Sequence, residues 1–271
     1  MILTDTHSHI YSDKYDEDIE HFMDRAFKNN IKRIFVPNIN YSTVSKMLKL
    51  TSKYPNILFP MIGLHPCYVD ENFKEQLDLI KQYLKNKNIC AIGEIGIDLY
   101  WDKSLIKFQK EAFIIQLNWA TKMKIPVVIH CRNSFNDIYE ILISEKYNSL
   151  SGVFHCFTGS LEQANKIIDL GFYLGIGGVV TFKNSGLDKV LEKVDIRNIL
   201  LETDSPYLAP SPFRGKLNES SYLYYIAKKI SEIYNIDIDK VANITTNNSC
   251  LLYTSDAADE GLGVDLGGRR I

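Results

Sequence analysis

The feature that most constrains the fold of this chain is an alternation of short β-branched runs with longer amphipathic segments. The runs contain few polar residues, so the strands that they predict are expected to be buried on both faces, as parallel strands covered by helices are. The predicted strands span residues 1–5, 31–37, 57–63, 89–93, 125–130, 151–155, 172–177 and 198–203. The helical segments between them span residues 15–29, 42–54, 73–85, 103–123, 135–145, 161–170 and 187–194.

Eight such units in a chain of 271 residues predict an α/β fold, a single-domain (β/α)₈ TIM barrel. An open doubly wound sheet is the alternative, but no G-x-G-x-x-G turn follows the first predicted strand. We expect residues 1–250 to form the barrel. Residues 251–271 contain no lysine and no asparagine and have neither helical nor strand periodicity. They are expected to be a non-native or disordered tail, either a frameshift or assembly scar or a flexible C-terminus.

The composition indicates where the protein works and how it can hold a substrate. The net charge is −2, so no global positive field exists and a nucleic acid would have to be held locally. The five cysteines form no C-x-x-C pair and their number is odd, which favours a reducing compartment over a disulfide framework. The first predicted strand begins at the start of the sequence, so we expect no signal peptide, and no apolar run approaches the length of a membrane span. We therefore expect a cytoplasmic protein with no membrane association and no obligate protein partner.

Polar side chains follow most of the predicted strands. In a (β/α)₈ barrel the C-terminal ends of the strands meet at one mouth, where active sites are built. Any one of these residues has an ordinary structural explanation, as a buried histidine or a turn-capping carboxylate, but their common position favours one site. The sixth histidine, His21, lies in a helical segment and is expected at the surface. The residues at the mouth are His7, His9, His65, Glu94, His130, His155 and Asp204.

Their donor atoms are typical of a metal centre. His7 and His9 are two residues apart in an extended segment, so both imidazoles are expected on one face. Four imidazoles and two carboxylates exceed the needs of one tetrahedral ion and suit two divalent cations that share a bridging carboxylate. Glu94 is the expected bridge and therefore a catalytic candidate. Nitrogen and oxygen ligands favour zinc, manganese or iron, whereas magnesium is unusual with this many imidazoles.

We expect the two ions to divide the remaining ligands between them. His7 and His9 would bind the ion that Asp204 completes, and His130 with His155 would hold the second ion. Asp204 is also placed to accept a proton from the attacking water, which makes it the second catalytic candidate.

Further residues are predicted to contact the substrate. Arg132 and the Arg214–Lys216 loop are placed to neutralise a phosphate, with a solvated surface position as the alternative. Tyr100 and Trp101 are placed to stack on a base, although Trp101 packing against its own helix is an equal alternative. Glu202, two residues before Asp204, shares its inward face and is expected to orient the ligands beside the substrate. The predicted substrate-binding residues are His65, Tyr100, Trp101, Arg132, Glu202, Arg214 and Lys216.

With these residues assembled, the chain resembles the TatD family of metal-dependent deoxyribonucleases, within the amidohydrolase-like barrel hydrolases. The motifs that carry the resemblance are D-T-H-S-H at residues 5–9, G-L-H-P at 63–66, G-E-I-G-I-D at 93–98, P-V-V-I-H-C-R at 126–132, H-C-F-T-G-S at 155–160 and L-E-T-D-S-P-Y-L-A-P at 201–210. They occur in order over about residues 3–250. The chain departs after Cys250, where the family usually ends its last helix around an asparagine and an aliphatic-aromatic pair.

The resemblance implies the fold, the metal ligands and the reaction. The implied ligands are His7, His9, Glu94, His130, His155 and Asp204, with His65 near the substrate. The implied activity is hydrolysis of phosphodiester bonds that depends on divalent metal ions, with 3′-to-5′ exonuclease action on DNA. We expect two divalent ions, magnesium, manganese or zinc, and single-stranded DNA or DNA ends as the substrate.

Three alternatives remain at this point. The first is a D-aminoacyl-tRNA deacylase, which cleaves an ester at the end of a nucleic acid. The second is an amide, lactone or ester hydrolase of the amidohydrolase type, although these commonly bridge their metals with a modified lysine where this chain has Glu94. The third is a barrel retained as a binding scaffold, which a complete ligand set makes difficult to support.

Overall fold

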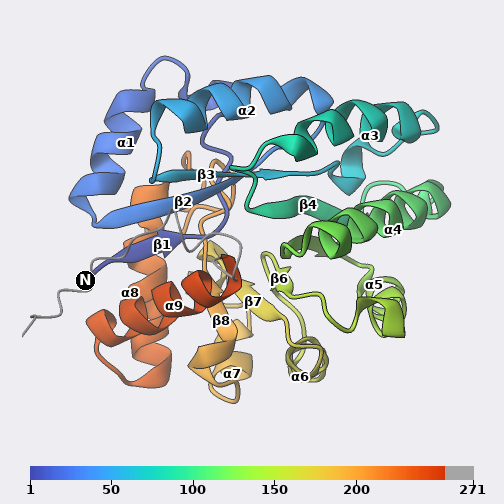
Figure 1. Cartoon of the computed structure of the whole chain (residues 1–271). Helices are drawn as coiled ribbons and strands as arrows, with labels where there is room; N and C mark the ends of the chain where they lie inside the picture. The colour runs from blue at the N-terminus through green and yellow to red at the C-terminus, as the bar shows by residue number, and fades with distance from the viewer. Residues whose placement is uncertain (254–271) are drawn as a thin grey trace, which may run out of the picture.

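The eight predicted strands are all present in the computed structural model, which describes residues 1–253. They pair in parallel and in chain order within one sheet, and the helices surround them (Figure 1). The prediction of a (β/α)₈ barrel is confirmed. The strands are β1 (Leu3–Asp5), β2 (Ile31–Pro37), β3 (Leu58–Ile62), β4 (Ala91–Asp98), β5 (Val127–Arg132), β6 (Gly152–Phe154), β7 (Tyr173–Ile176) and β8 (Ile199–Leu201).

Hydrogen bonds between the ends of β1 and β8 close the barrel. The Thr6 amide donates to the Leu201 carbonyl at 3.0 Å, and the Asp204 amide donates to the His7 carbonyl at 2.9 Å. Ser8 and Ser205 continue the contact as a parallel bridge. The first and last strands therefore meet at the residues for which metal binding is predicted.

The seven helices predicted between the strands are present, and two more follow β8. These last two have no counterpart among the predicted segments, because the strand-helix alternation that marks the others ends at β8. No helix within residues 1–253 has the length and apolarity needed to cross a bilayer. The helices are α1 (Ile19–Lys28), α2 (Tyr41–Lys53), α3 (Phe73–Lys81), α4 (Ile106–Met123), α5 (Phe135–Leu142), α6 (Leu161–Asp169), α7 (Leu187–Leu191), α8 (Leu223–Tyr234) and α9 (Ile238–Tyr253).

β4 is longer than predicted. It continues past Gly93 to Asp98, because a shift in its register with β5 between Ile92 and Ile95 absorbs the Gly93–Glu94 pair. The glycines that suggested the end of a strand instead mark a bulge inside it. Asp98, rather than Gly93, is the residue at which β4 ends.

Alternation along the strands divides the barrel interior into two levels. Side chains two residues apart share a face, so Val128 and His130 both point inward on β5, as do Val153 and His155 on and just after β6. The first residue of each pair lies nearer the N-terminal end of the strand, the lower level, and belongs to an apolar cluster. The second residue lies at the upper level and carries an imidazole. The cluster consists of Phe35, Met61, Ala91, Val128, Val153, Leu200, Leu252 and Tyr253.

The end of α9 covers this lower, N-terminal opening of the barrel. Leu252 and Tyr253 are 2% and 7% exposed, and the Tyr253 ring lies 4.1 Å from the Phe35 ring between centroids. The helix thus continues three residues past the boundary predicted at residue 250, because these side chains fill the apolar opening. The rest of the predicted tail, 254–271, lies outside the described residues.

Truncation of Leu252 tests whether α9 contributes to the core at this point. We expect Leu252→Ala to lower the free energy of unfolding by about 2–5 kcal/mol, because a buried leucine leaves a cavity when it is shortened. Leu251→Ala is the matched control, since Leu251 is 72% exposed and its loss should change stability by less than about 0.5 kcal/mol. Urea denaturation of the two variants measures the difference. Equal stabilities would contradict this role for the end of α9.

Candidate metal centre

All five histidines predicted at the barrel mouth surround the carboxylate of Glu94, which is 2% exposed. Oε2 lies close to two of them, His7 Nε2 at 3.1 Å and His9 Nε2 at 3.6 Å. Oε1 lies close to the other three, His130 Nδ1 at 2.7 Å, His65 Nε2 at 3.2 Å and His155 Nε2 at 3.4 Å. The two oxygens therefore face different sets of imidazoles, as a bridging carboxylate would.

The bulge in β4 brings this carboxylate to the centre of the mouth. Gly96 has a φ of +147°, and a Cβ at this position would lie 1.9 Å from the His130 carbonyl oxygen. Only glycine allows β4 to approach β5 so closely there. The second glycine of the motif is thus required by the backbone that holds Glu94 and His130 together.

The two central carboxyl groups have opposite pKa shifts. Burial acts to raise the pKa of Glu94, but the neighbouring His65, His155 and His7 outweigh it and hold that pKa well below its ordinary value. Burial raises the pKa of Asp204 to about 6, against a smaller opposing effect of His155. Glu94 is therefore an ionised group at the centre of the site, whereas Asp204 is closer to a proton acceptor suited to neutral pH.

The arrangement of donor atoms fits divalent cations. His7 Nε2 and His9 Nε2 face each other at 3.3 Å, and His7 Nδ1 is buried without a partner among the described residues. Nitrogen atoms that converge in this way on carboxylate oxygens are typical of metal sites. Three groups have ligand atoms that all lie within 4.8 Å of one another, namely His7–His155–Asp204, His7–His9–Glu94 and His65–Glu94–His130.

The imidazoles around Glu94 fall into the two expected sets, but those around Asp204 do not. Asp204 Oδ1 lies 3.6 Å from His9 Nε2, 3.8 Å from His7 Nε2 and 3.9 Å from His155 Nε2. His155 was expected to pair only with His130. Its ring stacks on His7 with 3.7 Å between centroids, whereas the His130 ring is 6.2 Å away. His155 thus lies between the two groups of ligands.

His65 is held in one tautomer by the backbone. Its Nδ1 accepts a hydrogen bond from the Cys67 amide at 3.1 Å, so Nε2 carries the proton in the neutral ring. Nε2 is the atom that faces Glu94 Oε1. His65 is therefore a hydrogen-bond donor at the mouth, which suits its predicted place beside the substrate better than direct metal binding.

Asp98 is a site residue that the sequence reasoning missed. Its carboxylate accepts from His130 Nε2 at 2.9 Å, which orients the ring so that Nδ1 faces Glu94. Burial acts to raise the pKa of Asp98, but the hydrogen bond from His130 outweighs it and lowers the pKa to about 2. The G-E-I-G-I-D motif held the signal, because residues 94, 96 and 98 alternate along one strand.

Glu202 lies behind His155 rather than beside a substrate. Its Oε1 is 3.1 Å from His155 Nδ1 and accepts from the Cys156 amide at 2.5 Å, while the side chain is fully buried. A Cβ on Gly175 would lie 2.4 Å from Glu202 Oε2, so a glycine is needed to make room for this carboxylate. The position fits the expected orienting role and leaves no surface for substrate contact.

Arg132 lies over two exposed aromatic rings just after His130. Its guanidinium carbon is 3.7 Å from the Tyr100 ring centroid and 5.6 Å from the Trp101 ring centroid. Trp101 is 73% exposed, so the alternative that it packs against its own helix is wrong. Arg132, Tyr100 and Trp101 form an exposed surface of one cation and two aromatic rings, called the platform below.

Arg214 and Lys216 lie in the loop after β8 and are both exposed. Arg214 contacts the Phe182 ring at 4.5 Å, and Lys216 lies 6.0 Å from the Phe213 ring centroid. Neither side chain forms an ion pair with a described residue, which leaves both charges available to an anion. His21 is on the surface of α1, away from the site, as expected.

Comparisons with known proteins identify relatives of this chain. The family model described as TatD related DNase matches residues 4–254. An uncharacterized metal-dependent hydrolase of Bacillus subtilis, YabD, is 38% identical over 93% of this chain and 99% of its own length. A second uncharacterized metal-dependent hydrolase, YcfH of Escherichia coli, is 30% identical over 95% of this chain and 98% of its own length.

A solved structure shows the same fold. The crystal structure of YjjV, a TatD homolog from Escherichia coli, has a TM-score of 0.87 to this chain at 27% identity. The match covers 93% of this chain and 98% of YjjV. The chain therefore has relatives over almost its whole described length, both in sequence and in structure.

Removal of the Glu94 carboxylate tests its place at the centre of the site. We expect Glu94→Ala to lose most of the metal that the wild-type protein binds, because this one side chain faces all five clustered histidines. His21→Ala is the control, since this histidine is exposed on α1. Inductively coupled plasma mass spectrometry of the purified proteins gives the metal content per chain. Unchanged metal content in Glu94→Ala would contradict the central position of this carboxylate.

Proposed function

This chain belongs to the TatD family of metal-dependent hydrolases, and from that premise we propose that it is a deoxyribonuclease. It hydrolyses phosphodiester bonds of DNA, with single strands or ends as substrate and 3′-to-5′ exonuclease action. The observation that carries this proposal is the Glu94 carboxylate, whose two oxygens face separate sets of imidazoles. The guanidinium of Arg132, close to His130 in the chain, forms no ion pair within residues 1–253.

The ligand groups at the mouth have the donor atoms for two divalent ions. His7, His9, Glu94, His155 and Asp204 would hold them together with His130. When bound, such ions polarise a phosphodiester and lower the pKa of a nearby water. Two ions of magnesium, manganese or zinc are the proposed cofactors.

Protein side chains supply the proton transfers and the charge that a phosphodiester needs. Asp204, whose pKa is raised toward neutrality, accepts the proton of the attacking water. The Nε2–H group of His65 faces Glu94 Oε1 at 3.2 Å and would donate to a substrate oxygen beside that carboxylate as negative charge develops there. Glu94 remains ionised and acts as a ligand throughout.

The platform and the loop after β8 favour a nucleic acid over a smaller ester. The guanidinium of Arg132 is free to bind a phosphate, and the exposed rings of Tyr100 and Trp101 offer surfaces on which bases stack. Arg214 and Lys216 add positive charge in the exposed loop after β8. An amide or lactone substrate would use none of these groups, whereas a charged tRNA end would use some of them.

Replacement of Asp204 tests the proposed reaction. We expect Asp204→Asn to reduce nucleotide release from end-labelled single-stranded DNA by at least about 100-fold, because it removes the proton acceptor and one ligand. Asp169→Asn, on the exposed end of α6, is the matched control and should keep wild-type activity. The assay compares single- and double-stranded DNA and D-aminoacyl-tRNA with Mg²⁺, Mn²⁺ and Zn²⁺. Hydrolysis of charged tRNA without hydrolysis of DNA would refute the deoxyribonuclease in favour of the deacylase.

Replacement of Arg132 tests the platform. We expect Arg132→Met to raise KM for single-stranded DNA about tenfold with little change in kcat, because a hydrogen-bonded phosphate contact is lost. The slope of log(kcat/KM) against log salt concentration should become less steep by about 1, the change expected when one phosphate contact is lost. Arg197→Met is the control, since Arg197 pairs with Asp195 in the structure. A steady-state series at several salt concentrations decides, and an unchanged KM and slope would remove Arg132 from the substrate site.

A further inference from the structure

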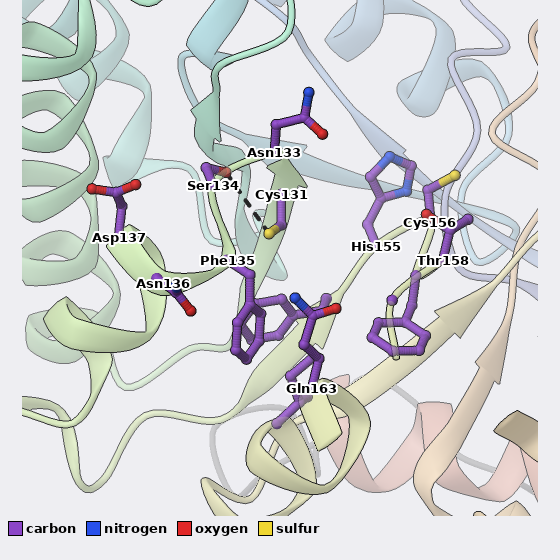
Figure 2. A pocket seen from close by; sticks show the side chains of 14 residues that line it. Cys131, Asn133, Ser134, Phe135, Asn136, Asp137, His155, Cys156, Thr158 and Gln163 are labelled. Atoms are coloured by element: carbon purple, nitrogen blue, oxygen red, sulfur yellow. Dashed lines mark hydrogen bonds between the residues drawn. The ribbon is translucent and has the colours of Figure 1, made fainter. Parts of the chain in front are cut away.

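A cavity of about 380 Å³ opens between the loops that follow β5 and β6 (Figure 2). Its lining comes from Cys131 and residues 133–137, at the end of β5 and the start of α5, and from residues 154–159, Gln163 and Ile167, after β6 and on α6. The volume lies near the lower limit of pockets that bind small molecules, about 300–1,000 Å³. It is therefore large enough for one ring system and too small for a longer segment of a chain.

The cavity shares a wall with the candidate metal centre. His155 lines it, and the Nε2 atom of the same ring is 3.4 Å from Glu94 Oε1. His155 is thus the residue that belongs both to this cavity and to the candidate metal centre. None of the substrate-binding residues predicted from the sequence lines this cavity.

Three aromatic rings contribute to the lining of the cavity. Phe135, Phe154 and Phe157 line it, with 6.3 Å between the ring centroids of Phe135 and Phe154. Phe135 is partly exposed, so its ring is accessible from the cavity. Gly159 packs closely against two of the lining side chains, because a Cβ there would lie 2.4 Å from Gln163 Oε1 and 2.8 Å from the Phe157 ring. Such a surface suits the face of a planar ligand.

One hydrogen-bond donor is fixed in the cavity. Gln163 Oε1 accepts from the Ser160 amide at 3.0 Å, which identifies this atom as the carbonyl oxygen and leaves the amide NH₂ on the other side. The NH₂ group has no partner among the described residues. Figure 2 shows the carboxamide of Gln163 rising from α6 between Phe135 and His155. The donor is held in place because the same side chain forms the capping box of α6.

The charges around the cavity disfavour an anion. Among the described residues, no lysine or arginine lines it. The one carboxylate in its lining, Asp137, lies in the first turn of α5 and pairs with Lys110. Asp137 also complements the partial positive charge of that helix end, which reduces its attraction for a phosphate. A neutral planar group with hydrogen-bond acceptors fits this environment.

We infer that this cavity binds the nucleobase of the nucleotide beside the hydrolysed bond. The inference rests on the proposed function and adds a base-binding subsite to it. The base lies against Phe135 and accepts a hydrogen bond from the Gln163 amide, while its phosphate lies at the metal centre. All four bases carry acceptor atoms, so the subsite can hold any base. It prefers thymine to cytosine, because thymine has the acceptor O4 at the position where cytosine has an amino donor.

Nucleotide binding tests the subsite without any bond cleavage. Isothermal titration calorimetry of the manganese-loaded protein compares thymidine 5′-monophosphate, deoxycytidine 5′-monophosphate and 2-deoxyribose 5-phosphate, which has no base. We expect thymidine monophosphate to bind at least about tenfold more tightly than deoxyribose phosphate. Phe135→Ala should reduce that advantage to less than about threefold. The melting temperature of the variant shows whether it is folded.

Gln163→Glu provides a second variant with a distinct signature. The glutamate keeps an oxygen for the Ser160 amide but replaces the donor with an acceptor. We expect this substitution to weaken the binding of thymidine monophosphate more than that of deoxycytidine monophosphate, because the cytosine amino group can donate to the carboxylate. Asn165→Asp, which adds the same charge to an exposed position of α6 outside the cavity, should leave the order of affinities unchanged.

The outcomes separate this inference from the proposed function. Equal binding of thymidine monophosphate and deoxyribose phosphate, undetectable binding of both, or a base preference that survives both substitutions would overturn the subsite. Absence of DNA hydrolysis would instead overturn the proposed function, since the affinities are measured on nucleotides that the protein does not cleave. A base preference that Phe135→Ala removes, and whose order Gln163→Glu changes, supports the subsite.

Discussion

The hydrogen bonds between the ends of β1 and β8 are the contact on which the candidate site depends. They join Thr6 to Leu201 and His7 to Asp204, residues almost 200 positions apart in the chain. The buried carboxylate of Asp5 strengthens the same seam by accepting from the Thr203 amide at 2.9 Å and its hydroxyl at 2.7 Å. Closure of the barrel therefore also brings Asp204 close to His7 and His9.

Burial of an ionised carboxylate among imidazoles costs folding free energy, which other interactions in the barrel must offset. Transfer of an ionised group from water is unfavourable unless its partners compensate, and at Glu94 five histidines do so. Asp98 and Glu202 orient two of these rings from behind. Below them an apolar level, completed by α9, supplies hydrophobic burial that the polar mouth lacks. Polar chemistry is thus confined to one end of the barrel.

The sequence predicted the eight strands and the residues at their ends because both follow from alternation. A strand buried on both faces is a continuous apolar run, and the inward polar residue appears where that run ends. Asp98 was missed because a bulge at Gly93–Glu94 interrupts the run and hides the five further residues of β4. The tautomer of His65 depends on a backbone amide, and the cavity beside His155 depends on the shape of two loops. The hydrophobic periodicity of the sequence specifies neither the tautomer nor the cavity, so both could be found only in the structure.

The most direct test of the central claim is the position of bound metal relative to Glu94. A crystal structure of the zinc-loaded protein, with anomalous scattering recorded at the zinc edge, locates each ion independently of the protein atoms. We expect two peaks on either side of the Glu94 carboxylate, each within about 2.0–2.2 Å of one of its oxygens and of at least one imidazole nitrogen. Peaks that avoid Glu94, or one ion bound by the histidines alone, would contradict a bridged centre at this mouth.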